Sequence, residues 1–111
     1  MVDVRPDFTV QQENGETVYM MLVNGKVVCT ARTLANTLET IGTVGNERKK
    51  GYATAMLQHI EDEARRKGVK KFSAHDILPD DEKAVNFFKK NGYTLTRVPE
   101  QEDMLEGTKE L

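Results

Sequence analysis

The most informative residues are three consecutive cations followed by a glycine, Arg48-Lys49-Lys50-Gly51, between a predicted strand and a predicted helix. The glycine lets the backbone turn sharply and approach a ligand closely. The first turn of the following helix leaves amide N–H groups free and carries the positive end of the helix dipole. Together these features favour a phosphate or pyrophosphate ligand. The segment alone is equally compatible with a basic turn before a surface helix.

Two well-known phosphate-binding motifs are excluded by their spacing. Neither the Gly-Lys-Ser/Thr of a P-loop after an earlier glycine nor the Gly-x-Gly-x-x-Gly of a dinucleotide-binding turn occurs. Residues 48–90 carry 11 Lys/Arg against 7 Asp/Glu, although the whole chain has a net charge of −2. This basic centre favours a local anionic ligand, unless its lysines are solvated helix faces. No nucleic-acid partner is expected, because no aromatic residues interleave with the cations of residues 65–71 to stack on bases.

Asn-Gly pairs divide the first half of the chain into strands. Asn14-Gly15 and Asn24-Gly25 each separate two runs that are rich in β-branched, aromatic or long apolar residues. Asn-Gly suits the type I′ turn of a hairpin, in which both central residues need a positive φ. The sequence therefore predicts an antiparallel meander of three strands and a fourth strand that leads into the basic segment. These strands cover residues 8–12, 17–23, 26–32 and 38–44.

Apolar residues in the second half recur at helical spacing. One helix is predicted to run from the basic segment to Lys67-Gly68, with an apolar stripe on one side and charged residues opposite. The stripe consists of Ala53, Met56, Leu57, Ile60 and Ala64. The charged side consists of Glu61, Asp62, Arg65 and Arg66. A second helix is predicted between Pro79 and Asn91-Gly92, where Asp80 or Asp81 can cap the free amides.

Further strands are predicted at residues 69–74, 93–98 and near 104–111. The resulting order predicts a mixed α/β (α+β) fold, in which two helices pack on one mostly antiparallel sheet. A chain of 111 residues is expected to form one domain, because its halves would be too small to hold separate cores. Within it, a strand meander covers about 8–44, a strand-loop-helix unit about 38–67, and a C-terminal β-α-β unit about 69–111.

The basic segment and the second helix together resemble the GNAT superfamily of acetyl-coenzyme A-dependent N-acetyltransferases. Arg48, Gly51 and Ala53 fit the pattern Arg/Gln-x-x-Gly-x-Gly/Ala of the family's motif A. Residues 84–93 are similar to the family's segment Ala-x-x-Phe-Tyr-x-Lys-x-Gly-Phe. The two blocks occur in the family's order over roughly residues 38–98. The resemblance implies a GNAT-like acyl-CoA N-acyltransferase fold.

The resemblance also implies transfer of an acetyl group from acetyl-coenzyme A (acetyl-CoA) to a primary amine of a small molecule or protein. The pyrophosphate of CoA would lie on the amides at the start of the first helix. The pantetheine arm would run beside the fourth strand, Phe88 would line the thioester end, and a backbone amide of residues 43–45 would stabilise the oxyanion. The implied cofactor-binding residues are Thr43, Val44, Arg48, Lys49, Lys50, Gly51, Tyr52, Ala53, Thr54 and Phe88.

Three features depart from the family. Its usual members have a strand and two helices before the meander, whereas the roughly 16 residues before Thr17 leave room for one strand. The acceptor side would then be open, or a second copy paired at an exposed sheet edge would complete it as a homodimer. Phe88 stands where the family often has a tyrosine that protonates the leaving thiolate, and Asp81 where it often has an asparagine. These departures keep a second interpretation open, a non-catalytic CoA-binding module that acts as a sensor or interaction partner.

An amine acceptor is mostly protonated near neutral pH, so transfer needs a general base. Glu39 is one candidate, because strand alternation places it on the face of Ile41 and Thr43 and some family members use a glutamate on that strand. His75 is the other, because a histidine after the strand over 69–74 can titrate in the useful range. Each is equally compatible with an exposed polar residue. No carboxylate cluster at ligand spacing accompanies the histidines, so no metal is expected.

The cysteine content, the length of the apolar runs and the charges near the N-terminus indicate the cellular compartment. Cys29 is the only cysteine and lies among apolar strand residues, which predicts a buried thiol and fits a reducing cytoplasm. The longest apolar run, residues 18–23, is far shorter than the roughly 20 residues that a membrane span needs. Asp3, Arg5 and Asp7 interrupt the segment in which a signal peptide would have its apolar core. A cytoplasmic protein without a membrane partner is therefore expected.

Overall fold

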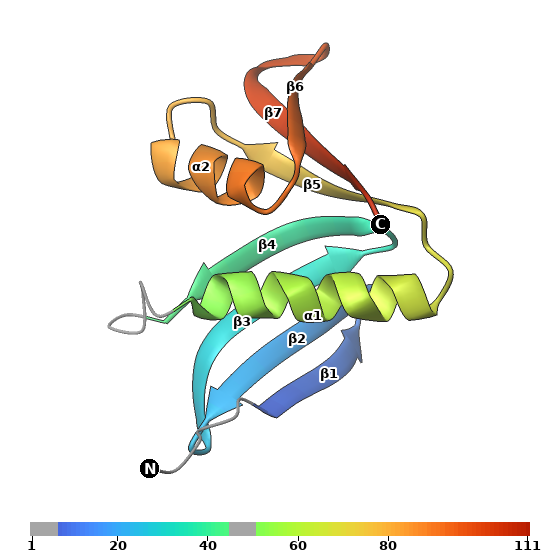
Figure 1. Ribbon diagram of the computed structural model, residues 1–111, viewed down its shortest axis with the longest axis vertical. Coiled ribbons are helices and arrows are strands. Elements are labelled where there is room, and N and C mark those ends of the chain that lie inside the picture. The colour runs from blue at the N-terminus through green and yellow to red at the C-terminus, as the bar shows by residue number, and fades with distance from the viewer. Residues whose placement is uncertain (1–6, 45–50) are drawn as a thin grey trace.

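Seven strands form one mixed sheet, on which two helices pack (Figure 1). The computed structural model describes residues 7–44 and 51–111, and for residues 101–103 the backbone alone. In chain order the elements are β1 (Asp7–Glu13), β2 (Glu16–Val23), β3 (Lys26–Leu34), β4 (Thr37–Thr43), α1 (Tyr52–Arg66), β5 (Lys71–Ile77), α2 (Glu82–Lys90), β6 (Thr94–Val98) and β7 (Gln101–Glu110). The strand order is β1-β2-β3-β4-β5-β7-β6, with β4 and β5 parallel and the other neighbours antiparallel. The predicted fold class is confirmed.

Both Asn-Gly turns form hairpins, as the sequence predicts. The φ angles are 52° and 83° in Asn14-Gly15 and 54° and 76° in Asn24-Gly25. Positive φ at both central residues gives a turn whose twist matches that of the flanking strands. β1 therefore returns directly into β2, and in this described part of the chain no helix separates the two strands.

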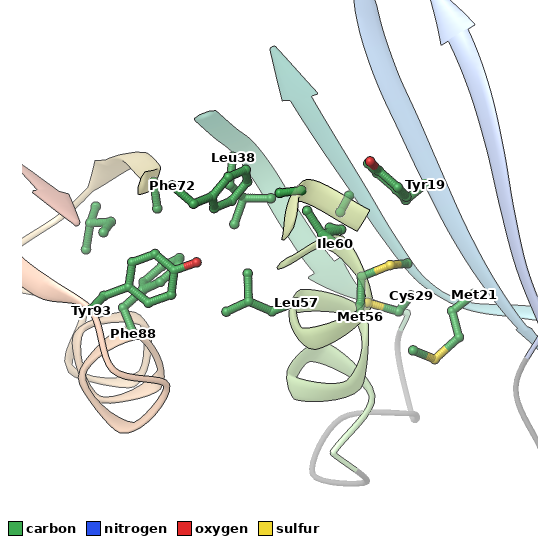
Figure 2. Packing of buried hydrophobic residues seen from close by; sticks show 14 of the residues in the cluster. Tyr19, Met21, Cys29, Leu38, Met56, Leu57, Ile60, Phe72, Phe88 and Tyr93 are labelled. Atoms are coloured by element: carbon green, nitrogen blue, oxygen red, sulfur yellow. The ribbon is translucent and has the colours of Figure 1, made fainter. Parts of the chain in front are cut away.

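α1 crosses the sheet and buries its predicted apolar stripe. Met56, Leu57 and Ile60 are at most 2% exposed. Figure 2 shows this helix between two groups of buried residues: Tyr19, Met21 and Cys29 on one side, and Phe72, Phe88 and Tyr93 on the other. The Cys29 thiol is buried, as predicted, and burial raises its pKa, which keeps it protonated. Within residues 7–44 and 51–111, no helix combines the length and apolar composition needed to cross a membrane.

One residue of α1 lies on a different side from the one predicted. The structure buries Glu61 to 2% exposure instead of placing it among the exposed charges. Glu61 follows Leu57 by four residues and precedes Ala64 by three, so it lies on the apolar stripe itself. The Tyr93 hydroxyl donates to its Oε2 at 2.7 Å, and the Lys109 ammonium donates to its Oε1 at 2.9 Å. Both partners follow much later in the chain, which the periodicity of one helix cannot reveal.

Candidate active site

A cleft of about 620 Å³ opens where β4 and β5 part, and α2 and the first turn of α1 complete its walls. The two strands pair only at Thr37 with Ser73 and at Leu38 with Ala74. Figure 1 shows them diverging toward the side on which α2 and the start of α1 lie. Because the paired segment is this short, most of β4 presents its free edge to the cleft.

A bulge in β4 lies at the point of divergence. Thr33 of β3 pairs with Leu38, but the preceding Arg32 pairs with Thr40, so Glu39 is an extra residue on β4. A bulge bends its strand and re-aims the side chains near it. The regular alternation assumed from the sequence is therefore interrupted at Glu39, although this half-buried side chain still lines the cleft.

A second bulge lies directly across the cleft, in β5. Three steps along β5 from Ala74 to Ile77 face two steps along β7, which leaves an extra residue at His75-Asp76. Asp76 has a φ of 61°, a left-handed conformation that aspartate adopts more readily than most residues. β5 thus extends beyond the predicted 69–74, and His75 and Asp76 both line the cleft.

The amide of Thr43 points into the cleft. The next amide, of Val44, donates to the carbonyl oxygen of Val28 on β3 at 2.9 Å. Successive amides of an antiparallel strand point to opposite edges, so the Thr43 N–H is directed away from β3 and toward β5. β5 has already parted from β4 at this level. Of residues 43–45, Thr43 has an N–H that faces the cleft, Val44 has its N–H occupied by β3, and Gly45 lies outside the described residues.

The start of α1 has few contacts with the other described residues. Gly51 precedes the helix with a φ of 77°, and no described atom lies within 4 Å of where a Cβ would stand. Among the described residues, no side chain caps the first-turn amides. Tyr52 packs partly against the core and Thr54 is half-buried, which leaves the backbone of this turn as its available surface.

The other predicted cofactor-binding residues are distributed unevenly. Thr43, Ala53 and Phe88 all line the cleft. The Val44 side chain is exposed, and its amide serves β3. The predicted cations Arg48, Lys49 and Lys50 lie outside the described residues.

The two candidate bases lie on opposite walls of the cleft. Glu39 is half-buried on β4, whereas the His75 side chain on β5 is 45% exposed. The Nε2 atom of His75 lies 3.4 Å from Oε1 of Glu106 on β7. The other histidine, His59, stacks on Phe8 with ring centroids 4.0 Å apart, at the β1 side of α1.

The α2 wall of the cleft is aromatic. Phe88 is buried, and its ring meets the edges of Phe87 and Tyr93, at centroid distances of 5.1 and 5.5 Å. Burial, and then the hydrogen bond to Glu61, raise the pKa of Tyr93. The Tyr93 hydroxyl donates to Glu61, and Tyr93 is not among the residues that line the cleft. Asp81 caps α2 by accepting from the Ala84 amide at 3.1 Å.

Lys83 is a cleft residue that the sequence did not indicate. It lines the cleft together with Glu39, Asp76 and Asp81, the acidic side chains among the described lining residues. In the sequence, Lys83 has the pattern of an ordinary exposed helix residue. Its position at the cleft follows from the packing of α2 beside the parted strands. In residues 7–44 and 51–111, no three His, Cys, Asp or Glu side chains gather where they could hold a metal ion.

Comparison with known proteins assigns the family. A model described as "Acetyltransferase (GNAT) family" matches residues 2–93. The chain belongs to this family. A search of curated proteins found no match.

Solved structures share the fold at low sequence identity. PaiA N-acetyltransferase from Thermoplasma acidophilum, in complex with coenzyme A, is 13% identical, with a TM-score of 0.76 over 87% of this chain and 62% of that one. A GNAT family acetyltransferase from Elizabethkingia anophelis, with acetyl-CoA bound, is 17% identical, with a TM-score of 0.74 over 87% and 77%. An acetyltransferase from Bacillus subtilis, in complex with CoA, is 11% identical, with a TM-score of 0.80 over 96% and 99%. The chain thus spans less than two thirds of the first of these proteins and nearly all of the third.

Proposed function

We propose that the protein is an N-acetyltransferase, which moves an acetyl group from acetyl-CoA to a primary amine of a small molecule or protein. The observation that carries the proposal is the cleft between the parted β4 and β5, which the start of α1 and Phe88 both line. A ligand with a pyrophosphate at one end and a long thioester arm matches this combination of a helix terminus and an apolar cleft wall. Membership of the GNAT family supports the same chemistry.

The start of α1 fits the pyrophosphate. No side chain in the described part of the chain caps the amides of residues 52–54, and no described atom lies within 4 Å of where a Cβ of Gly51 would stand. An anion there meets free N–H donors and the positive end of the helix dipole. The cations Arg48, Lys49 and Lys50 directly precede this turn in the sequence, and we assign them to the same phosphates.

The Thr43 amide is suited to polarise the thioester. It donates a hydrogen bond toward the carbonyl oxygen, on which negative charge develops as the amine nitrogen attacks the carbonyl carbon. A protonated amine first gives one proton to Glu39, directly or through a water molecule, and so gains the lone pair with which it attacks. As the new C–N bond forms, the C–S bond breaks and the sulfur leaves with its electron pair. The nitrogen then loses its second proton to water, and the thiolate takes up a proton from water, so CoA is released as the thiol.

The charges of the cleft favour a cationic acceptor. Of the described residues that line it, Glu39, Asp76 and Asp81 are acidic and Lys83 is a lysine. Carboxylates in this part of the wall attract an amine that arrives protonated. Polyamines and lysine-rich peptides therefore belong in the first panel of acceptors.

The choice of base is testable by two substitutions. We expect Glu39→Gln to lower kcat/KM for the amine about a hundredfold at neutral pH, because glutamine cannot accept the proton. The deficit should shrink at alkaline pH, where more of the amine is already unprotonated in solution. His75→Asn serves as the matched control, and we expect a smaller change because its ring is exposed and close to Glu106. A larger loss in His75→Asn than in Glu39→Gln, measured over the same pH range, would assign the base to His75 instead.

A non-catalytic CoA-binding module is the second candidate. It is favoured by the α2 wall, where Phe88 lacks a hydroxyl and the Tyr93 hydroxyl is engaged by Glu61. Thiol release from acetyl-CoA, followed with polyamine, peptide and amino-acid panels, separates the two functions. Amine-dependent release together with an acetylated product supports the transferase, and CoA binding without release supports the module. If neither CoA nor acetyl-CoA binds, both functions are wrong.

A further inference from the structure

Glu61 is a buried carboxylate that the proposed chemistry does not use. Its side chain is 3% exposed, and it joins two elements that are distant in sequence, through the Tyr93 hydroxyl before β6 and the Lys109 ammonium on β7. The guanidinium of Arg65, one turn along α1, lies 4.0 Å from Oε1. The Lys109 ammonium also lies 5.7 Å from the centroid of the Tyr93 ring. We call Glu61, Tyr93 and Lys109 the buried network.

Tyr93 connects this network to the wall of the cleft. Its backbone amide donates to the Phe88 carbonyl oxygen at 2.9 Å, and the two rings meet edge to face. Its ring lies close to β7 at Gly107, where an added Cβ would stand 3.4 Å from Tyr93 Cδ2 and 3.1 Å from a Leu95 methyl. The Tyr93 ring is therefore held on two sides, by Phe88 and by β7 at Gly107. Because Phe88 packs against this ring and lines the cleft, Tyr93 helps to position the cleft wall.

Glu61 connects the same network to the phosphate end. It lies ten residues after Gly51 on one helix, a distance of about 15 Å along the axis. An α-helix transmits a displacement along its length, so a shift at Glu61 moves the first turn of α1 relative to α2. One network thus holds the two parts of the cleft that a single CoA molecule would have to span.

We propose that the buried network is a positioning device, in which Glu61, Tyr93 and Lys109 fix the α2 wall of the cleft relative to the start of α1. The proposal rests on the proposed use of the cleft for acetyl-CoA. A buried ion pair stabilises a fold poorly, because desolvation offsets most of its attraction. The hydrogen bonds of the buried network are directional, however. Directional contacts of this kind hold the residues of a binding site in a fixed geometry. Removal of one partner still destabilises the fold, because it leaves the other group buried and unpaired. The effect on ligand geometry is therefore measured on variants that remain folded.

The test compares a long and a short ligand on the same variants. Acetyl-CoA would contact both ends of the cleft, whereas 3′-phosphoadenosine 5′-diphosphate keeps the pyrophosphate and lacks the pantetheine arm. Tyr93→Phe keeps the ring and removes the hydroxyl, and Glu61→Gln keeps the shape and removes the charge. We expect each variant to bind acetyl-CoA about tenfold more weakly in isothermal titration, with the affinity for the short ligand unchanged. Glu63→Gln is the matched control, since Glu63 is on the same helix but is half-buried and pairs with Arg66 at 2.9 Å instead of with the buried network.

Each outcome decides a different question. Equal weakening of both ligands, or of neither, would overturn the positioning role while leaving the proposed function intact. A wild-type protein that binds neither ligand would instead remove the proposed function and the positioning role with it. Thermal unfolding of each variant verifies that it is folded at the temperature of the titration, and Tyr93→Phe alone decides the question if Glu61→Gln does not fold. Once an acceptor amine is identified, kcat/KM for acetyl-CoA gives a second readout. We expect it to fall in the variants at a temperature where they are fully folded.

Discussion

Acetyl-CoA is expected to bind the wild-type protein and to lose at least about a hundredfold in affinity when Gly51 is replaced by aspartate. The new carboxylate would stand beside the first-turn amides of α1, where we place the pyrophosphate. Two unit charges about 4 Å apart repel by about 4 kcal/mol at an effective dielectric constant of about 20, and each 1.4 kcal/mol or so is tenfold in affinity. Isothermal titration of acetyl-CoA into both proteins measures the difference directly.

Gly51→Asn is the control for this substitution. Asparagine and aspartate have the same shape and both tolerate the positive φ of 77° at this position. No described atom lies within 4 Å of a Cβ there, so neither side chain is expected to clash. The difference between the two variants therefore isolates the charge. Equal affinities for Asn and Asp would mean that no phosphate lies at this helix terminus.

Replacing Thr43 by proline should lower kcat about a hundredfold to a thousandfold, the range measured when an oxyanion donor is removed. Proline has no N–H, and the Thr43 amide is the one that points away from β3 into the cleft. The sheet loses no hydrogen bond to β3 from this change. Initial rates with a responsive amine, at saturating acetyl-CoA, measure the effect on the chemical step.

Thr43→Val is the matched control for the proline variant. Valine keeps the β-branched shape and the backbone N–H and removes the hydroxyl alone. We expect its rate to stay close to that of the wild type. A proline variant that also stays active would place the oxyanion donor elsewhere on β4, and a slow valine variant would assign the role to the hydroxyl.

The parts of the fold that were predictable from sequence are those set by local chemistry. Asn14-Gly15 and Asn24-Gly25 fix hairpins, because the turn type they favour is compatible with few other structures. The stripe that includes Met56, Leu57 and Ile60 predicts a helix that covers a sheet, and the helix does so. The family resemblance implied that a CoA arm runs beside the fourth strand, but the parting of β4 from β5 is seen only in their short pairing.

The parts that were not predictable depend on contacts between distant segments. The bulge at Glu39 is defined by its register against β3, and the one at His75-Asp76 by its register against β7. No local pattern distinguishes these residues from regular strand residues. Glu61 is the clearest case, because a glutamate on a helix is normally solvated, and its burial depends on Tyr93 and Lys109.

The position of β7 has a consequence for biosynthesis. β7 is made after β5 and β6, yet it lies between them in the sheet. On the ribosome, β5 and β6 therefore have no strand to join them until residues 101–110 have emerged, whereas the β1–β4 meander can pair as it is made. Lys109 is among the last residues synthesised in β7, so Glu61 lacks this ammonium group until then. The cleft wall at Phe88 is thus completed only after β7 has been made, although α1, β5 and α2 all precede it in the chain.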